Sequence, residues 1–202
     1  MALTVVKLGG SLDRDPALRD WLQLLLEAGR GRVVVVAGGG AFADLVRDHQ
    51  AHWRFDDLAA HNMAVLAMMQ SATLLKALAP DLVLAAGPDA AARALGEQRV
   101  ALWWPRGWLR SAPDELTHWG ATSDSLAATL AASLDAARLV LVKSCAIPAG
   151  LDLPTLSALG VVDADFCRIT ASARYAIDLL SKTETARLRR LLQDDAQPQA
   201  GP

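Results

Sequence analysis

Five short stretches of this chain are apolar at nearly every position, and longer segments with a helical repeat separate them. A strand buried on one face alternates apolar and polar residues, whereas a parallel strand covered on both faces is apolar throughout. The expected strands span residues 3–8, 33–37, 82–86, 100–103 and 139–142. Strands that alternate with helices predict an α/β fold, here a three-layer αβα sandwich around an open, mostly parallel sheet.

The segments between these strands predict helices, and the last quarter of the chain predicts further elements. The helices are expected at residues 16–28, 41–49, 56–79, 89–95 and 124–137, followed by helical pieces at 153–159, 175–180 and 185–192 and a strand at 167–170. Asp15 and Pro16 predict the start of the first helix, because Asp caps helices and Pro fits their first position. We expect one domain over residues 1–193 and a disordered polar tail at 194–202.

Composition narrows the class of protein. Among 202 residues, 52% are hydrophobic and 21% are charged, which is the balance of a globular chain. The net charge is −2 and no basic stripe is seen, so a nucleic-acid partner is not expected. Cys145 and Cys167 lack the spacing of a metal or redox motif, and the four histidines form no metal-binding pattern. These features predict a reduced, cytoplasmic protein without a metal-ligating residue set.

The N-terminus and the longest helix predict no membrane attachment. The N-terminus has one lysine inside a short apolar run, which is not the pattern of a signal peptide. The apolar helix at 56–79 is interrupted by several polar side chains, so we expect it to lie inside a domain. These side chains belong to His61, Asn62, Gln70, Ser71 and Lys76.

Two of the apolar strands end in a lysine, at Lys7 and Lys143. A buried ammonium group is costly unless it meets an anion, and the carboxyl ends of parallel strands are where ligands bind. After Lys7, the pair Gly9 and Gly10 allows a ligand to approach the backbone closely, and Ser11 adds a donor. The alternative is a lysine that reaches solvent from a strand end beside an ordinary turn.

Gly38, Gly39 and Gly40 connect a strand to a helix, which is the geometry in which free amides and the helix dipole bind an anion. Together with Ala43 they also match the dinucleotide fingerprint, but that fingerprint requires a second strand about 20 residues further on, where a helix is expected. An NAD(P) enzyme is therefore disfavoured. Close packing of the three glycines remains the structural alternative.

Asp124 and His61 are each open to two interpretations. Asp124 opens a helix, so it either serves the helix dipole or orients two cations across a shared phosphate. His61 is either a satisfied core residue or a ligand contact. Near them in the sequence, His118 and Trp119 border the Asp124 motif. We expect both to lie close to the same pocket.

Three of the six tryptophans fall in one short segment, at Trp103, Trp104 and Trp108. Their rings predict either stacking on a planar ligand such as a furan or burial against a partner subunit.

Together these segments resemble the amino-acid-kinase superfamily, which includes acetylglutamate, aspartate, uridylate and isopentenyl phosphate kinases. The matching motifs are VVKLGGS at 5–11, VVVVAGGGAFADLVR at 33–47, TSDSLAATLA at 122–131 and LVLVK at 139–143. The resemblance implies the amino-acid-kinase (carbamate-kinase-like) fold, with the acceptor against the N-terminal half and ATP with Mg²⁺ over the C-terminal half.

The resemblance also implies roles for individual residues. Lys7, Asp124 and Lys143 would be catalytic, with Asp124 organising the two lysines around the transferred phosphoryl group. The nucleotide would meet a set of loop residues, and the acceptor a second set. These are Gly9, Gly10, Ser11 and Ser144 for the nucleotide, and Gly38, Gly39, Gly40, His61 and Ser123 for the acceptor.

AHNMAVLAMMQ at 60–70, WGATSDSLAA at 119–128 and GVVDADF at 160–166 are similar to the furan phosphate kinases of methanofuran biosynthesis. That branch implies a homo-oligomeric, ATP-dependent kinase that converts a small phosphomonoester, an aminomethyl-furanylmethyl phosphate, to its diphosphate. The chain departs from many relatives after Lys143, where an Asp and a Gly are missing, and its segment after residue 150 is short. The alternative is therefore a non-catalytic binding or assembly subunit on the same fold.

Overall fold

A computed structural model describes residues 2–194 and contains one six-stranded sheet in the order β3-β4-β2-β1-β5-β6. Every pair of neighbouring strands is parallel, which confirms the predicted fold class. The strands are β1 Thr4–Leu8, β2 Val33–Ala37, β3 Val83–Ala85, β4 Ala101–Trp103, β5 Arg138–Lys143 and β6 Ala176–Ser181. The central strands β1 and β2 are buried at every position, as their apolar sequences predict.

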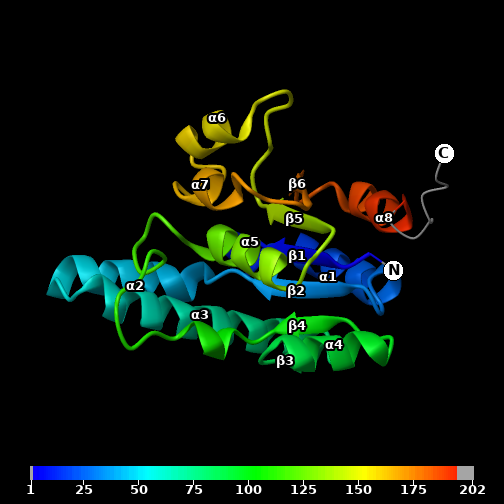
Figure 1. Cartoon of the computed structure of the whole chain (residues 1–202), viewed down its shortest axis with the longest axis horizontal. Helices are drawn as coiled ribbons and strands as arrows, with labels where there is room; N and C mark the ends of the chain where they lie inside the picture. The colour runs from blue at the N-terminus through cyan, green and yellow to red at the C-terminus, as the bar shows by residue number, and fades with distance from the viewer. Residues whose placement is uncertain (1, 195–202) are drawn as a thin grey trace.

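Helices cover both faces of the sheet (Figure 1). The α-helices are α1 Ala17–Ala28, α2 Gly40–Trp53, α3 Asp57–Leu78, α4 Pro88–Gly96, α5 Ser123–Ser133, α6 Leu153–Ala158, α7 Phe166–Thr170 and α8 Thr185–Asp194, and η1 Gly10–Leu12 and η2 Pro105–Trp108 are 3-10 turns. One apolar core joins the sheet to α4, α5 and α7, and a second core joins it to α1 and α8. Helix α3 contributes to both cores.

The alternation along β1 and β5 decides where the two strand-end lysines point. Val5 and Leu141 belong to the core that contains α5, whereas Val6 and Val142 belong to the core that contains α1. Lys7 is two residues after Val5, and it lies opposite Leu141 in the β1–β5 register. Both Lys7 and Lys143 therefore face α5.

The C-terminal part corrects two expectations. Residues 175–180 were expected to be helical, but Ala176–Ser181 forms β6, which pairs with β5 along its whole length. Residues 167–170 were expected to form a strand, but Phe166–Thr170 is helix α7, in which Thr170 Oγ1 donates to the carbonyl of Phe166. Pairing with β5 favours a strand at residues 176–181, and burial of Phe166 favours the helix at residues 166–170. Both effects depend on distant contacts, which the local sequence does not reveal.

The edge strand β3 corrects a third expectation. Residues 82–86 were predicted to be buried on both faces, yet Leu84 is 41% exposed, because β3 pairs only with β4 at the edge of the sheet.

The observed helix bounds differ from the predicted ones by a few residues. Asp15 accepts from Ala17 N at 3.0 Å, although Pro16 is the N-cap of α1. Of the tail expected at 194–202, Asp194 ends α8 and the rest lies outside the described residues.

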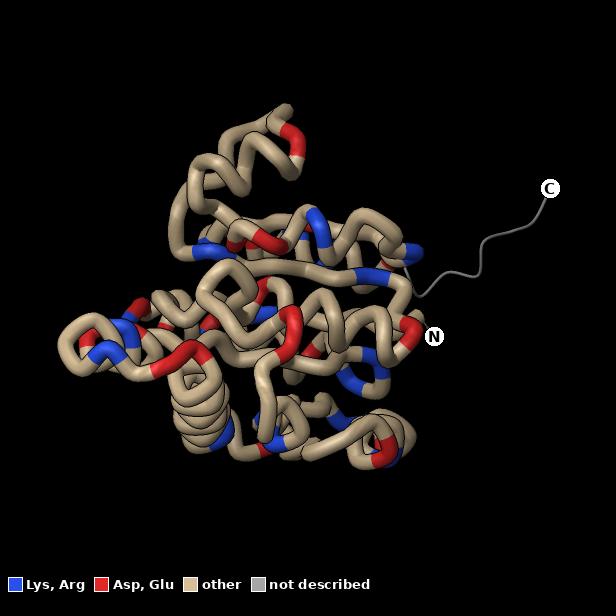
Figure 2. Tube along the Cα trace, turned by 60° about the vertical axis from the view of Figure 1, so that its left-hand side comes forward, with Lys and Arg blue, Asp and Glu red and all other residues tan. Residues whose placement is uncertain are grey.

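Helices α2 and α3 form an antiparallel pair that extends past the carboxyl ends of the strands (Figure 1). By length and composition α3 is apolar enough to cross a membrane, with a mean hydropathy of 1.2 over its most apolar window, 44% of which is buried. In this structure α3 packs against α2, β2 and η2. Positive and negative residues are interspersed along the trace in Figure 2 and gather on no single element in that view.

Candidate active site

Lys7, Asp124 and Lys143 meet at the carboxyl end of the sheet and form what we call the triad. Lys7 Nζ donates to Asp124 Oδ1 at 2.8 Å, and Lys143 Nζ donates to Asp124 Oδ2. Lys7 is 4% exposed and Asp124 is 3% exposed, so this contact is shielded from water. The three residues come from β1, β5 and the first turn of α5. Together they carry one net positive charge.

The charges of the triad shift two pKa values. Burial alone would raise the pKa of Asp124, but Lys7 and Lys143 outweigh burial and hold that pKa below its usual value. For Lys143, burial and the nearby charge of Lys7 lower the pKa, although Asp124 and Asp163 pull it upward. Asp124 is therefore ionised, and Lys143 holds its proton less tightly than a free lysine does.

The N-terminus of α5 is capped from outside the helix by Asp163, a residue that the sequence analysis left without a role. Asp163 accepts four hydrogen bonds: from the amide and the hydroxyl of Thr122 and from the amide and the hydroxyl of Ser125. The N-cap residue Thr122 itself makes no side-chain capping bond. Asp163 thus fixes the helix turn that carries Asp124.

The two glycine loops pack directly against each other beside the triad. A Cβ on Gly10 would lie 2.2 Å from Gly40 N, and a Cβ on Gly38 would lie 2.5 Å from Gly10 N. Gly9 N donates to Val142 O at 2.9 Å, and a Cβ on Gly9 would lie 2.8 Å from that oxygen. Close backbone packing, which the sequence analysis left as an alternative, therefore accounts for these glycines sterically.

Packing does not use every amide of the loop. Gly38 N donates to Leu8 O at 2.9 Å, and Ala41 N donates to Asp13 Oδ2 at 3.3 Å. Within residues 2–194, Gly39 N and Gly40 N donate to no protein acceptor. Gly40 also has a φ of 55°, in the left-handed region that favours glycine. Two amides at the start of α2 thus remain for a ligand.

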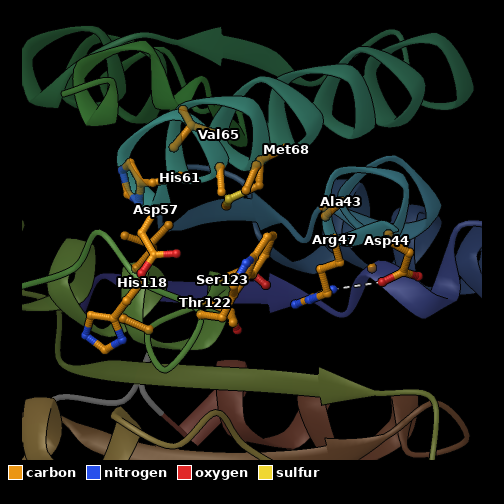
Figure 3. A pocket seen from close by; sticks show the side chains of 18 of the residues that line it. Ala43, Asp44, Arg47, Asp57, His61, Val65, Met68, His118, Thr122 and Ser123 are labelled. Carbon is orange, nitrogen blue, oxygen red and sulfur yellow. Dashed lines mark hydrogen bonds and ion pairs between the residues drawn. The ribbon is translucent and has the colours of Figure 1, made fainter. Parts of the chain in front are cut away.

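A cavity of about 240 Å³ lies beside these loops, between α2, α3 and the N-terminus of α5 (Figure 3). The predicted acceptor residues Gly39, Gly40, His61 and Ser123 line it, together with Gly10 and Ser11 of the predicted nucleotide set. Its remaining wall combines small and apolar side chains with a few charged ones. These are Ala43, Asp44, Arg47, Asp57, Ala60, Ala64, Val65, Met68, His118, Trp119, Ala121, Thr122 and Leu126.

His61 is both a buried residue and a cavity residue. It is 8% exposed, and its Nε2 lies 3.0 Å from Trp108 O. A carbonyl only accepts, so Nε2 carries a proton and Nδ1 is the ring atom that remains for a ligand. An acceptor phosphate at Nδ1 would need the doubly protonated, cationic ring.

Trp103, Trp104 and Trp108 do not line this cavity, so of the two alternatives given for them, stacking on a planar ligand in this cavity is not supported. Trp103 is 6% exposed in the α5-side core, where its ring centroid lies 5.9 Å from that of Trp108. Trp104 packs against the opposite core. The tryptophan that lines the cavity is Trp119, which together with His118 was expected close to the same pocket.

Ser11 and Ser144, both predicted to meet the nucleotide, lie in contact with each other. Their hydroxyl oxygens lie 2.7 Å apart, joining the loops that follow β1 and β5. Among the described residues, no group of three or more His, Cys, Asp or Glu side chains is arranged to hold a metal ion. Any divalent cation at this site would take its ligands mainly from a bound phosphate and water.

We expect the ionisation of Asp124 to contribute to stability at neutral pH. Its folded-state pKa lies below the usual value of 3.8, so this contribution is present above that value and is lost as the pH falls through the folded pKa. Urea unfolding from about pH 5 downward should therefore show a smaller pH slope for Asp124→Asn than for the wild type. The other carboxyl groups with lowered pKa values are present in both proteins and contribute equally to both slopes. Equal pH slopes of the unfolding free energy would therefore contradict this prediction.

Comparisons with known proteins identify the family and the fold of this chain. The family described as "Amino acid kinase family" matches residues 2–146. No curated protein matches the chain in sequence at a significant level. The solved uridylate kinase from Archaeoglobus fulgidus is similar in structure, with a TM-score of 0.69 at 17% identity over 96% of each chain.

Two further solved structures share the fold. The UMP kinase from Bacillus anthracis has a TM-score of 0.70 at 13% identity, covering 96% of this chain and 92% of that chain. An isopentenyl phosphate kinase has a TM-score of 0.60 at 14% identity, covering 95% of this chain and 96% of that chain. Coverage at this level weakens the expectation of an abbreviated second half. The family match extends over most of the sequence, and the chain belongs to the amino acid kinase family.

Proposed function

We propose that the protein is a kinase that transfers the γ-phosphoryl group of ATP to a small phosphomonoester and releases a diphosphate. The triad is the observation that carries this proposal. Lys7 is buried and Lys143 is half-buried, and both share the carboxylate of Asp124, so the triad carries one net positive charge at the carboxyl edge of the sheet. A buried net charge is stable only beside a counterion, and a transferring phosphoryl group is such an anion.

In the proposed reaction an oxygen of the acceptor phosphate attacks the γ-phosphorus, and the bond between that phosphorus and the β–γ bridging oxygen breaks. ADP leaves with the electron pair of that bond. Lys7 and Lys143 stabilise the negative charge spread over the moving group, and Asp124 holds both ammonium groups in place. No residue needs to remove a proton, because the acceptor oxygen is already ionised.

The single domain proposed for residues 1–193 divides this work between its halves. The nucleotide lies over the C-terminal half, where Gly9, Gly10, Ser11 and Ser144 approach its phosphates and Mg²⁺ is bound by those phosphates and water. The acceptor occupies the cavity, where the amides of Gly39 and Gly40, with Ser123 and His61, contact its phosphate. Gly38 supports this site by packing against Gly10.

The furan phosphate kinase branch supplies the specific acceptor of this proposal. An aminomethyl-furanylmethyl phosphate combines a compact phosphate with a small planar ring, and a cavity of about 240 Å³ suits a molecule of that class. We also propose a cytoplasmic homo-oligomer. Leu45 and Trp53 of α2 are 55% and 71% exposed, and this apolar surface is of the kind that a second copy would cover.

A non-catalytic binding subunit is the second candidate, and one observation favours it. After Lys143 the chain lacks the Asp and Gly expected of relatives, and Cys145 and Ala146 are exposed where the nucleotide would lie. In such a subunit the cavity would still hold a ligand, but the donor side would be inactive.

Replacing Lys7 by alanine should lower turnover by at least about 10²-fold, because one cation at the transferring group is lost. A coupled assay of ADP release measures the rate, and circular dichroism checks the fold. Lys76→Ala is the matched control, since Lys76 bonds the carbonyls of Pro80 and Leu82 at the far end of α3. Near-normal turnover in folded Lys7→Ala protein would show that Lys7 is only a strand-end lysine.

Phosphorus NMR should identify the acceptor. Mg-ATP is mixed with aminomethyl-furanylmethyl phosphate, isopentenyl phosphate, UMP, aspartate or acetylglutamate, and we expect a new diphosphate signal from the furan compound. The signal should grow more slowly with His61→Ala and normally with His52→Ala, a change at an exposed histidine of α2. An acyl phosphate from either amino acid would overturn the proposed acceptor class.

Thermal melting separates the two candidates. A ligand present at 100 times its Kd stabilises the native state by about 2.7 kcal/mol, so Mg-ATP should raise the Tm if the donor site is functional. No response to Mg-ATP would favour the binding subunit, and a rise with NADH would support the dinucleotide enzyme that the glycine pattern alone suggested.

A further inference from the structure

Arg47 lines the cavity but has no role in the proposed reaction. Gly40, Ala43, Asp44 and Arg47 follow one another at the spacing of one helix face, and all four line the cavity. Among the described residues that line it, Arg47 is the one lysine or arginine, whereas Asp44 and Asp57 supply two negative charges. A phosphomonoester that enters this cavity therefore meets a single permanent cation on its wall.

The guanidinium of Arg47 is held against Trp119. Its central carbon lies 4.3 Å from the centroid of the Trp119 ring, and an Arg47 nitrogen lies 2.8 Å from Asp44 Oδ1. The Asp44 pair is solvent-exposed, at 71% for the Asp44 side chain, so it contributes little to stability. The Arg47 side chain is itself 44% exposed, so the stacking contact on Trp119 is a second modest restraint on the guanidinium.

Trp119 is itself fixed by a chain of hydrogen bonds. Its indole nitrogen donates to Gln50 Oε1, and Gln50 Nε2 donates to Asp57 Oδ1 at 2.8 Å and to Phe55 O at 3.2 Å. These contacts join the loop before α5 to the corner between α2 and α3. Trp119 thus provides a rigid surface on which the guanidinium lies.

The side chain of Arg47 leans toward the N-terminal end of α2, where the glycine loop lies. Helical side chains lean toward the N-terminus of their own helix, and for α2 that end carries the free amides of Gly39 and Gly40. In Figure 3 the guanidinium points from α2 toward the side of the cavity where Ser123 begins α5. Asp124, the carboxylate of the triad, is the next residue.

We propose that Arg47, positioned by Trp119, binds the phosphate of the acceptor and so selects phosphomonoesters over uncharged analogues. This inference rests on the proposed function and adds a binding residue and a positioning residue to it. Guanidinium donors match two phosphate oxygens at once, whereas lysine offers a point charge. Because Arg47 serves the acceptor and not the nucleotide, its removal should separate the KM values of the two substrates.

Steady-state kinetics with Mg-ATP and the preferred phosphomonoester test this separation. Arg47→Ala should raise the acceptor KM about 10- to 100-fold, the range for a lost hydrogen bond to a charged group, while the ATP KM changes less than about twofold. The acceptor KM of Arg47→Lys should lie between those of the wild type and Arg47→Ala. Arg93→Ala, the same charge change on an exposed residue of α4, should leave both KM values unaltered.

Trp119 variants test the positioning role. Trp119→Leu should also raise the acceptor KM. Trp119→Phe should keep the acceptor KM close to the wild-type value, because phenylalanine also stacks on a guanidinium. A purely structural role of Trp119 would move kcat and both KM values together. Equal effects on acceptor and ATP KM, or none for Arg47→Ala, would overturn the inference.

Binding measured without ATP distinguishes this inference from the proposed function. Calorimetric titration with aminomethyl-furanylmethyl phosphate and isopentenyl phosphate should show binding to the wild type that weakens with Arg47→Ala. Arg47-dependent binding without any turnover would reject the kinase and keep the inference. Turnover with an unchanged acceptor KM in Arg47→Ala would keep the kinase and reject the inference. The absence of phosphomonoester binding to the wild type would count against both.

Discussion

One buried carboxylate holds one buried and one half-buried ammonium group, and the rest of the site is arranged around that contact. Asp124 is separated from Lys7 by 117 residues and from Lys143 by 19, so the contact exists only when β1, β5 and α5 are in their native places. Removing one partner of such a group leaves a charge that neither water nor protein compensates. The triad is therefore costly to assemble without an anion and well suited to receive one.

Much of this arrangement follows from local sequence. The apolar strands are recognisable because both of their faces are buried, and alternation along β1 and β5 directs Lys7 and Lys143 to the same face. Their parallel register then brings both lysines to one edge of the sheet. The position of Arg47 could also have been predicted, since its spacing from Gly40 and Ala43 places it on the same face of α2.

Other features depend on contacts between distant segments, which a single sequence does not reveal. Asp163 caps α5 across about 40 residues, and β6 is a strand because β5 offers it a partner. The three clustered tryptophans drew attention by composition, yet packing directs Trp103 into the core. The glycines serve two purposes at once, because the backbone packing that requires them also leaves the amides of Gly39 and Gly40 unpaired among the described residues.

The external cap on α5 bears on where the functional unit ends. The family match stops at residue 146, after all three triad residues, but Asp163 and the edge strand β6 lie beyond it. A fragment cut at that boundary would contain every charged group of the triad while leaving the amides of Thr122 and Ser125 without their acceptor. The part of the chain that the family model matches therefore lacks the cap of α5. The segment after residue 146 thus completes the structure around the triad.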